Sequence, residues 1–228
     1  MTLKGLVFDF DGLILDTELP EYQAWQDIYH RYNRELPLEE WAKILGTSPE
    51  YFDAAKYLEQ QTGLSLDCRA LHNEQRAIAD AIIRESTPLP GIVSMLTRAT
   101  ELKLRLAVAS SSPADWVLGH LTRLGLLRYF DHVFTARDVK QVKPDPELYL
   151  TAIRALGIQS YEAMAFEDSP NGITAALAAG LFCVAVPNTL TSKLNTDHAS
   201  IRYASLGTVT LDQVIEQFNL RTNHKDQH

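Results

Sequence analysis

The chain has 228 residues, enough for one substantial domain or for a core domain with a smaller insert. Its hydrophobic fraction of 46% and charged fraction of 22% are ordinary for a globular protein, and no apolar run approaches the roughly 18 residues of a membrane helix. The net charge is -8 without a lysine and arginine cluster. We therefore expect neither nucleic acid nor a membrane as a partner.

The cysteines and the N-terminus bear on the compartment. Cys68 and Cys183 are too few and too far apart for a disulfide framework, which is typical of a reduced cytosolic protein. The first apolar stretch is broken by aspartates and lacks a small-residue cleavage site, so a signal peptide is not expected. We predict a cytoplasmic monomer.

Five short apolar runs predict buried parallel strands. In chain order they cover residues 4–10, 104–109, 132–135, 163–166 and 182–186. Helical patterns at residues 92–101, 114–124, 147–156 and 171–179 lie between them. This alternation predicts βαβ units, and hence an α/β fold with a Rossmann-like parallel sheet core.

One region interrupts this alternation. Residues 19–85 contain no strand candidate and have helical patterns, punctuated by Pro37, Pro49 and Gly63, at 21–33, 38–45, 49–62 and 67–85. We predict an all-helical cap domain at 16–87, inserted into a core domain formed by 1–15 and 88–228. Because two connections join it to the core, the cap could move as a lid. The polar tail at 221–228 is expected to fray.

The first strand ends in two carboxylates. Asp9 and Asp11 leave it at the end where open α/β sheets bind ligands. One carboxylate can attack phosphorus, and the other can exchange a proton with the leaving group and with water. An Asp-Gly turn would explain the same residues without a function.

Hydroxyl groups and a lysine follow later in the chain. Ser110, Ser111 and Ser112 come after the second strand and could form an anion site at a helix N-terminus, while Ser112 could instead cap that helix. Pro144 and Pro146 restrict the backbone next to Lys143, and the charge of this lysine suits a phosphate oxygen. A single lysine, however, is more often on the surface.

Two more carboxylates, Glu167 and Asp168, follow the fourth strand. Four carboxylates at one edge are unfavourable unless a cation lies between them. Oxygen ligands from Asp9, Asp11, Glu167 and Asp168 suit Mg²⁺ better than zinc, and none of the seven histidines lies near these motifs. An aspartate capping the following helix would explain one of the two carboxylates but not the other.

The motifs DFDGLILDTE, VASSS, VKPDPELY and AFEDSPNGI occur in this order. Through them the chain resembles the haloacid dehalogenase (HAD) superfamily, in the branch with a helical cap after the first strand (subfamily IA). Within that branch it is similar to the group of sugar-phosphate phosphatases and β-phosphoglucomutase. The resemblance covers essentially the whole chain.

The resemblance implies a mechanism. Asp9 would attack the phosphoryl group, and Asp11 would protonate the leaving alcohol and then activate water. Mg²⁺ would be held by the carboxylates of Asp9 and Asp168 and the backbone carbonyl of Asp11, with Glu167 acting through water. Ser110, Ser111 and Lys143 would bind the phosphoryl group and stabilise its charge. The expected substrate is a small phosphorylated metabolite, with sugar phosphates favoured.

A β-phosphoglucomutase-like mutase is the main alternative. The mutases that the chain resembles carry a histidine where this chain has Glu21, and a cap arginine after a Gly-x-Ser turn where Ser48 is followed by Pro49. A mutase also needs a fixed cation for its second phosphate, and Lys56 is the cap residue we expect to contact substrate. A non-catalytic binding domain would require the loss of a catalytic residue, and a response-regulator-like receiver is disfavoured by the cap.

Overall fold

The computed structural model describes residues 2–47 and 49–223. Six parallel strands form one sheet in the order β3-β2-β1-β4-β5-β6. The strands are β1 (Gly5–Phe8), β2 (Arg105–Ala109), β3 (His132–Phe134), β4 (Ala163–Glu167), β5 (Phe182–Ala185) and β6 (Ile201–Arg202). The predicted α/β fold with a Rossmann-like parallel sheet and an inserted helical cap is confirmed. β6 was not predicted, because two residues make no periodic pattern.

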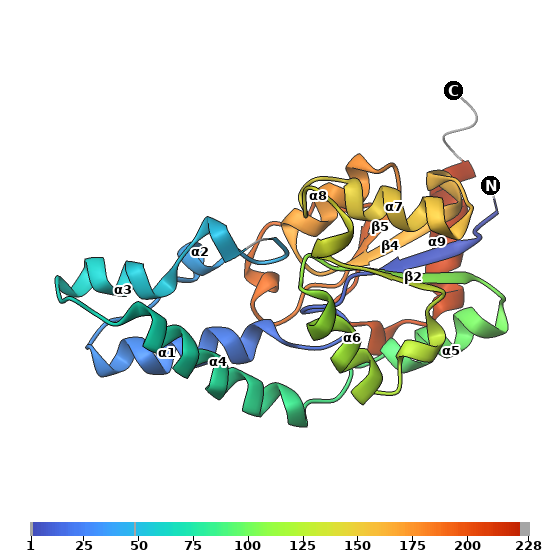
Figure 1. Cartoon of the computed structure of the whole chain (residues 1–228). Coiled ribbons are helices and arrows are strands. Elements are labelled where there is room, and N and C mark those ends of the chain that lie inside the picture. The colour runs from blue at the N-terminus through green and yellow to red at the C-terminus, as the bar shows by residue number, and fades with distance from the viewer. Residues whose placement is uncertain (1, 48, 224–228) are drawn as a thin grey trace.

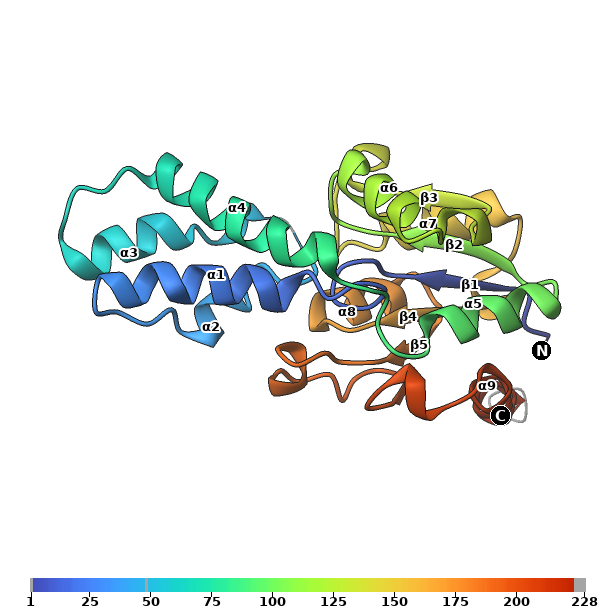
Figure 2. The same cartoon turned by 90° about the horizontal axis from the view of Figure 1, so that it is seen from below.

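Helices cover both faces of the sheet (Figures 1 and 2). They are α5 (Ile92–Glu101), α6 (Ala114–Arg123), α7 (Glu147–Leu156), α8 (Pro170–Ala178) and α9 (Leu211–Asn223). Strand residues on one face, such as Ala107 and Ala165, are small and pack with α7 and α8. Those on the other face, such as Phe8 and Phe166, are large and pack with α5, α6 and α9. The alternation along each strand thus sets how closely each helix layer approaches.

The cap forms a separate layer beyond one end of the sheet (Figure 1). It contains α1 (Glu18–Arg31), α2 (Leu38–Trp41), α3 (Ala54–Thr62) and α4 (Cys68–Glu85), which share their own hydrophobic core. The predicted helix at 38–45 ends early, at Trp41. The one predicted at 49–62 is divided, because the Asp53 side chain accepts hydrogen bonds from the backbone of Ala55 and Lys56 and starts α3 there. The exact domain boundaries stay a prediction.

The sequence analysis did not predict α9 and expected fraying from Arg221. That expectation is wrong for residues 221–223, which continue α9; residues 224–228 lie outside the described part. Val214 and Phe218 on α9 are fully buried against the large-residue face of the sheet. None of the helices in the described residues has the length and apolar character that crossing a membrane requires.

Removing the Phe218 ring should destabilise the core domain. Phe218 is fully buried and meets the Phe182 ring edge-on at a centroid distance of 5.4 Å. We expect Phe218→Ala to lower the free energy of unfolding by about 3–5 kcal/mol in urea titrations. Leu220→Ala is the matched control on the same helix, because Leu220 is 50% exposed, and it should change the value by less than about 0.5 kcal/mol. Equal effects of both substitutions would contradict this packing.

Candidate active site

The predicted site residues converge at the carboxyl end of the sheet. Asp9 directly follows β1, Ser110 follows β2, and Glu167 ends β4 with Asp168 after it. These strands are parallel neighbours, so their carboxyl ends share one edge. Lys143 reaches the same edge from the loop before α7. The structure therefore brings together a nucleophile candidate, a cation and further carboxylates from four distant segments.

Lys143 is the electrostatic centre of this cluster. Its side chain is inaccessible to solvent, and its Nζ lies 2.5 Å from Asp9 Oδ1 and 2.6 Å from Glu167 Oε1. The interpretation of Lys143 as a surface lysine is therefore wrong. Burial lowers the pKa of Lys143, but the charges of Asp9 and Glu167 outweigh burial and hold this pKa above its ordinary value. The lysine is thus firmly protonated.

One lysine does not balance the carboxylates around it. Burial, together with the charges of Glu167 and Asp11, raises the pKa of Asp9 to about 8 against the opposing charge of Lys143. Burial, together with Glu18 and Asp9, also raises the pKa of Asp168 well above its usual value. These shifts show a deficit of positive charge at the carboxylates.

The donor set fits a divalent metal ion. Asp9, Glu167 and Asp168 each offer a carboxylate oxygen within 4.8 Å of the others. Asp168 Oδ1 is buried and accepts no hydrogen bond from any residue that the structure describes. A buried oxygen without a partner is unfavourable unless a cation contacts it, and an all-oxygen set suits Mg²⁺. The carboxylate of the fourth predicted ligand, Asp11, lies outside this group.

Glu167 is held by contacts that the sequence analysis missed. The hydroxyl group of Tyr149 on α7 donates to Glu167 Oε1 at 2.5 Å, and the Asp168 backbone donates to Oε2 at 3.2 Å. A Cβ atom at Gly172 would come within 2.0–2.1 Å of the Glu167 carboxyl group, so only glycine fits at this position of α8. Tyr149 lies within VKPDPELY, and its place in this motif was the available signal.

The second carboxylate oxygen of Asp168, Oδ2, accepts a hydrogen bond that orients the side chain. Asn188 Nδ2 donates to Asp168 Oδ2 and to Glu18 Oε2, both at 2.9 Å. Gly12 has a φ of 77°, and a Cβ atom there would lie 2.5–2.8 Å from these three side chains. Ser169, rather than an aspartate, caps α8 by accepting from the Gly172 backbone at 3.2 Å. The proposed capping role for Asp168 is therefore wrong, which leaves its carboxylate for the site.

Asp11 is surrounded by four side-chain donors. Its Oδ1 accepts from Thr17 Oγ1 and Trp116 Nε1, both at 2.9 Å. Its Oδ2 accepts from Ser112 Oγ at 2.6 Å and Ser110 Oγ at 3.3 Å. Ser112 does not cap α6 as expected, because Pro113 occupies that position without a side-chain bond. Trp116 carries no motif signal in the sequence.

A cap loop lies directly over the core. Asn171 Nδ2 donates to the Leu45 carbonyl at 2.9 Å, and Ser111 Oγ donates to the Gly46 carbonyl at 3.3 Å. Thr47 Oγ1 donates to the Lys143 carbonyl. Ser111, predicted to bind substrate, thus contacts the cap here, and that role stays a prediction. Ser48 of the Gly-x-Ser turn lies outside the described residues.

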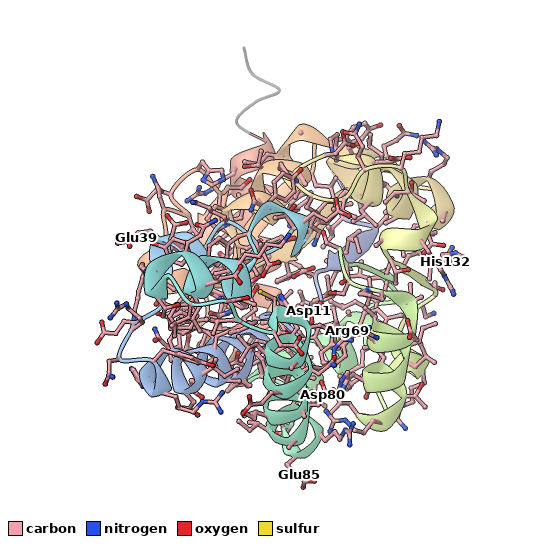
Figure 3. All side chains as sticks on the ribbon, turned by 60° about the vertical axis from the view of Figure 1, so that its left-hand side comes forward. Asp11, Glu39, Arg69, Asp80, Glu85 and His132 are labelled. Atoms are coloured by element: carbon pink, nitrogen blue, oxygen red, sulfur yellow. The ribbon has the colours of Figure 1, made fainter. Side chains whose placement is uncertain are left out.

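Lys56 is not brought into the cluster. It lies on α3, its side chain is 70% exposed, and its Nζ is 3.8 Å from Asp53. Its predicted contact with substrate therefore has no support from this arrangement and stays a prediction. Figure 3, with the cap turned forward, shows Arg69, Asp80 and Glu85 along α4.

Glu21 occupies the position where the mutases carry histidine. It lies on α1 and is partly buried. Burial, together with the charges of Asp11 and Asp80, raises its pKa to about 8 against the opposing charge of Arg76. At neutral pH Glu21 is therefore mostly a neutral acid.

Comparison with known proteins agrees with this geometry. Residues 6–186 match the family model of the haloacid dehalogenase-like hydrolases. The chain belongs to this family, so the resemblance seen in the sequence is confirmed.

Several relatives are individually similar. YhcW of Bacillus subtilis (strain 168), which is named as a phosphatase, is 41% identical over 95% of this chain and 98% of its own length. The fructose-1-phosphate phosphatase YqaB of Escherichia coli (strain K12) is 33% identical over 80% of this chain and 95% of its own length. The β-phosphoglucomutase structure from Clostridium difficile superposes with a TM-score of 0.76 at 25% identity, covering 97% of this chain and 99% of that one. The predicted enzyme class, a phosphoric monoester hydrolase of the HAD family, is confirmed.

A methyl group at Gly172 should displace the Glu167 carboxylate. We expect Gly172→Ala to lower the free energy of unfolding by about 1–3 kcal/mol, because the added atom overlaps a buried side chain. Gly119→Ala is the matched control, since Gly119 is also within a helix and a Cβ atom there meets nothing within 4 Å. That control should raise the stability by about 0.5–1 kcal/mol. A stabilising Gly172→Ala in urea unfolding would contradict the described contact.

The raised pKa of Glu21 predicts a pH-dependent stability. Between the ordinary pKa of 4.5 and about 8, the folded protein keeps a proton on Glu21 that the unfolded chain has lost. Stability contributed by this proton therefore falls as pH rises through that window. Glu21→Gln should remove this contribution, so that its free energy of unfolding relative to wild type rises by at least about 1 kcal/mol from pH 5 to pH 8.

The matched control is Glu39→Gln, at an exposed glutamate of the same cap (Figure 3). Its difference from wild type should stay constant from pH 5 to 8, as measured by urea unfolding. A constant difference for Glu21→Gln as well would show that Glu21 is not shifted.

Proposed function

We propose that the protein is a Mg²⁺-dependent phosphatase that hydrolyses small phosphorylated metabolites, sugar phosphates in particular, through an aspartyl-phosphate intermediate on Asp9. The observation that carries this proposal is the buried pairing of Asp9 with Lys143 beside Glu167 and Asp168, with Asp11 nearby. Phosphate ester hydrolysis in two steps requires one carboxylate that attacks and a second that moves protons, and this arrangement supports Asp9 and Asp11 in these roles.

The two steps can be assigned to residues. Lys143 fixes Asp9 through one carboxylate oxygen, and Asp9 attacks phosphorus while Asp11 gives its proton to the departing ester oxygen. Asp11 then takes a proton from water, the water oxygen bonds to phosphorus, and the aspartyl-phosphate bond breaks to release phosphate. Mg²⁺ held by Asp9, Glu167 and Asp168 would supply the positive charge that brings an anionic ester to this acidic site.

The size of the substrate follows from the cap. Leu45, Gly46 and Thr47 contact the core next to Lys143 and Ser111, so a bound ester must fit beneath them. A protein phosphosite would have to displace this loop, whereas a small metabolite need not. The names of relatives support the same class: a phosphorylated carbohydrates phosphatase of Thermotoga maritima is 29% identical, and the fructose-1-phosphate phosphatase is 33% identical.

The cap favours a phosphatase over a mutase. A mutase holds a second phosphate against a fixed cation. In this cap Lys43 Nζ lies 2.5 Å from Glu40, and the candidate Lys56 lies beside Asp53. Close to Asp11, the cap places the carboxyl group of Glu21 where the mutases have histidine. A second phosphate would therefore meet an acid at that position, with Arg76 as the cation near Glu21.

The expected cytoplasmic monomer belongs to this proposal. Cys68 and Cys183 are both free thiols, as a reducing compartment requires. Sedimentation of the purified protein would test the monomer directly.

Phosphate release from a panel of phosphorylated metabolites tests the activity. We expect release that requires Mg²⁺, stops on chelation, and falls at least about 1,000-fold in Asp9→Asn, because the nucleophile is lost. Asp197→Asn, at an exposed aspartate outside the site, should behave like wild type. Full activity in Asp9→Asn, or release without a divalent ion, would refute the proposed mechanism.

A second assay separates the mutase alternative. Wild type is incubated with β-glucose 1-phosphate, and both glucose 6-phosphate and free phosphate are measured. The proposal predicts free phosphate from at least one substrate of the panel and little isomerisation here. Efficient conversion to glucose 6-phosphate without phosphate release from any substrate would instead establish a mutase.

A further inference from the structure

The indole of Trp116 contacts the carboxylate that the proposed function uses as acid and base. Trp116 lies in the first turn of α6, is partly buried, and donates from Nε1 to Asp11 Oδ1 at 2.9 Å. A hydrogen bond to a carboxylate is directional and stronger than one between neutral groups. The indole therefore restricts where the Asp11 carboxylate can point.

A second set of contacts joins Trp116 to the cap. The His120 ring lies one helical turn further along α6 and meets the indole edge-on, with centroids 4.4 Å apart. Arg123 donates from Nε to His120 Nδ1 at 3.3 Å. The pKa of His120 is lowered by burial and by the charge of Arg123, so the ring is neutral at pH 7 and can accept this bond.

Arg123 completes the connection at the end of a cap helix. Its Nη1 donates to the Ser86 carbonyl at 2.9 Å, and its Nη2 donates to the Ile83 carbonyl at 3.1 Å. These carbonyls lie at the C-terminal end of α4, where a cation is favourable. Residue 86 begins the second of the two connections between cap and core.

The first connection contacts Asp11 directly. Thr17, which precedes α1, donates to the same oxygen, Asp11 Oδ1, at 2.9 Å. Both routes from the cap therefore meet at one carboxylate oxygen: one through Thr17, the other through Arg123, His120 and Trp116. A shift of the cap relative to the core cannot leave both sets of contacts unchanged.

We propose that Trp116 is a positioning residue for Asp11, and that Arg123 and His120 link its indole to the C-terminal end of α4, so that the placement of the acid/base follows the seating of the cap. This inference rests on the proposed function, in which Asp11 protonates the leaving group. Its consequence is selective in kcat/KM, which reports formation of the aspartyl-phosphate: misplacing Asp11 lowers this value only for esters whose leaving oxygen needs a proton. The later step, in which Asp11 activates water, is common to all esters.

Leaving-group dependence tests the role. Nitrophenolate leaves without protonation, whereas an alkoxide does not. We expect Trp116→Phe, which keeps an aromatic ring but removes the N–H donor, to lower kcat/KM for an alkyl phosphate by about 10- to 100-fold. The value for p-nitrophenyl phosphate should change by less than about threefold. Equal losses for both esters, or no loss for either, would overturn the proposal.

Trp41→Phe is the matched control. Trp41 Nε1 is buried in the cap and has no hydrogen-bond partner within residues 2–47 and 49–223, so this substitution removes an indole N–H without removing a described hydrogen bond. The ratio of the two kcat/KM values should stay as in wild type. Arg123→Gln tests the link without touching the indole: the ratio should shift in the same direction as in Trp116→Phe but by less. It also keeps the proposal testable if Trp116→Phe does not fold, because an unshifted ratio would refute the link.

Indole N–H signals in proton NMR give a second readout that needs no activity. The chain has three tryptophans, so substitution to phenylalanine assigns each signal. Asp11→Ala should move the Trp116 signal upfield and leave that of Trp41 in place. An unmoved Trp116 signal would refute the contact itself. A wild type without phosphatase activity would instead refute the proposed function, and this NMR comparison would still decide whether Trp116 holds Asp11.

Discussion

The structure depends on one buried ammonium group. Lys143 lies between Asp9 and Glu167, and its loss would leave these carboxylates buried without a paired cation, which is strongly unfavourable. Its backbone carbonyl also accepts from Thr47 of the cap, so the residue that stabilises the nucleophile is part of the cap contact. A single lysine still leaves the cluster short of positive charge, as the raised pKa values of Asp9 and Asp168 show. The same deficit that is unfavourable for the metal-free fold favours a divalent cation and then an anionic substrate.

Close approach of backbone and side chains makes this packing possible. The carboxylates of Glu167 and Asp168 lie where a Cβ atom would otherwise be, over Gly172 and Gly12 respectively. Gly46 makes the corresponding contact between the cap loop and Ser169, since a Cβ atom there would lie 2.0 Å from its hydroxyl oxygen. Three glycines thus set the spacing of the nucleophile edge, the metal ligands and the cap. At each of these glycines, a polar side chain occupies the space that a Cβ atom would otherwise fill.

The sequence predicted those parts of the site that topology places automatically. Asp9, Asp11, Glu167 and Asp168 follow strands, and the carboxyl ends of parallel strands meet at one edge whatever the details of packing. Tyr149, Asn188 and Trp116 could not be predicted in the same way. The contact between Trp116 and Asp11 joins residues 105 positions apart and depends on how α6 is rotated. The contact between Asn188 and Glu18 spans 170 positions. The two helix-capping errors have different causes. Ser169, next to Asp168, caps α8 instead, whereas Ser112 Oγ donates to Asp11 and Pro113 takes the cap position of α6 without a side-chain bond.

The contacts that hold the cap loop on the core differ from those expected to select a substrate. Leu45 and Gly46 bind the core through backbone carbonyls, so the loop seats in the same way whatever side chains the rest of the cap presents. Under the proposed function, selectivity would then come from cap side chains near the site, and Glu21 is a candidate because the charge of Asp11 helps to raise its pKa. A neutral carboxylic acid can both donate and accept hydrogen bonds, as sugar hydroxyl groups require, but it cannot balance a second phosphate. On the proposed function, this side chain would therefore suit a polyol monophosphate better than a bisphosphate. The same principle applies around Lys143: the charge balance of a buried site decides which charged groups can bind there.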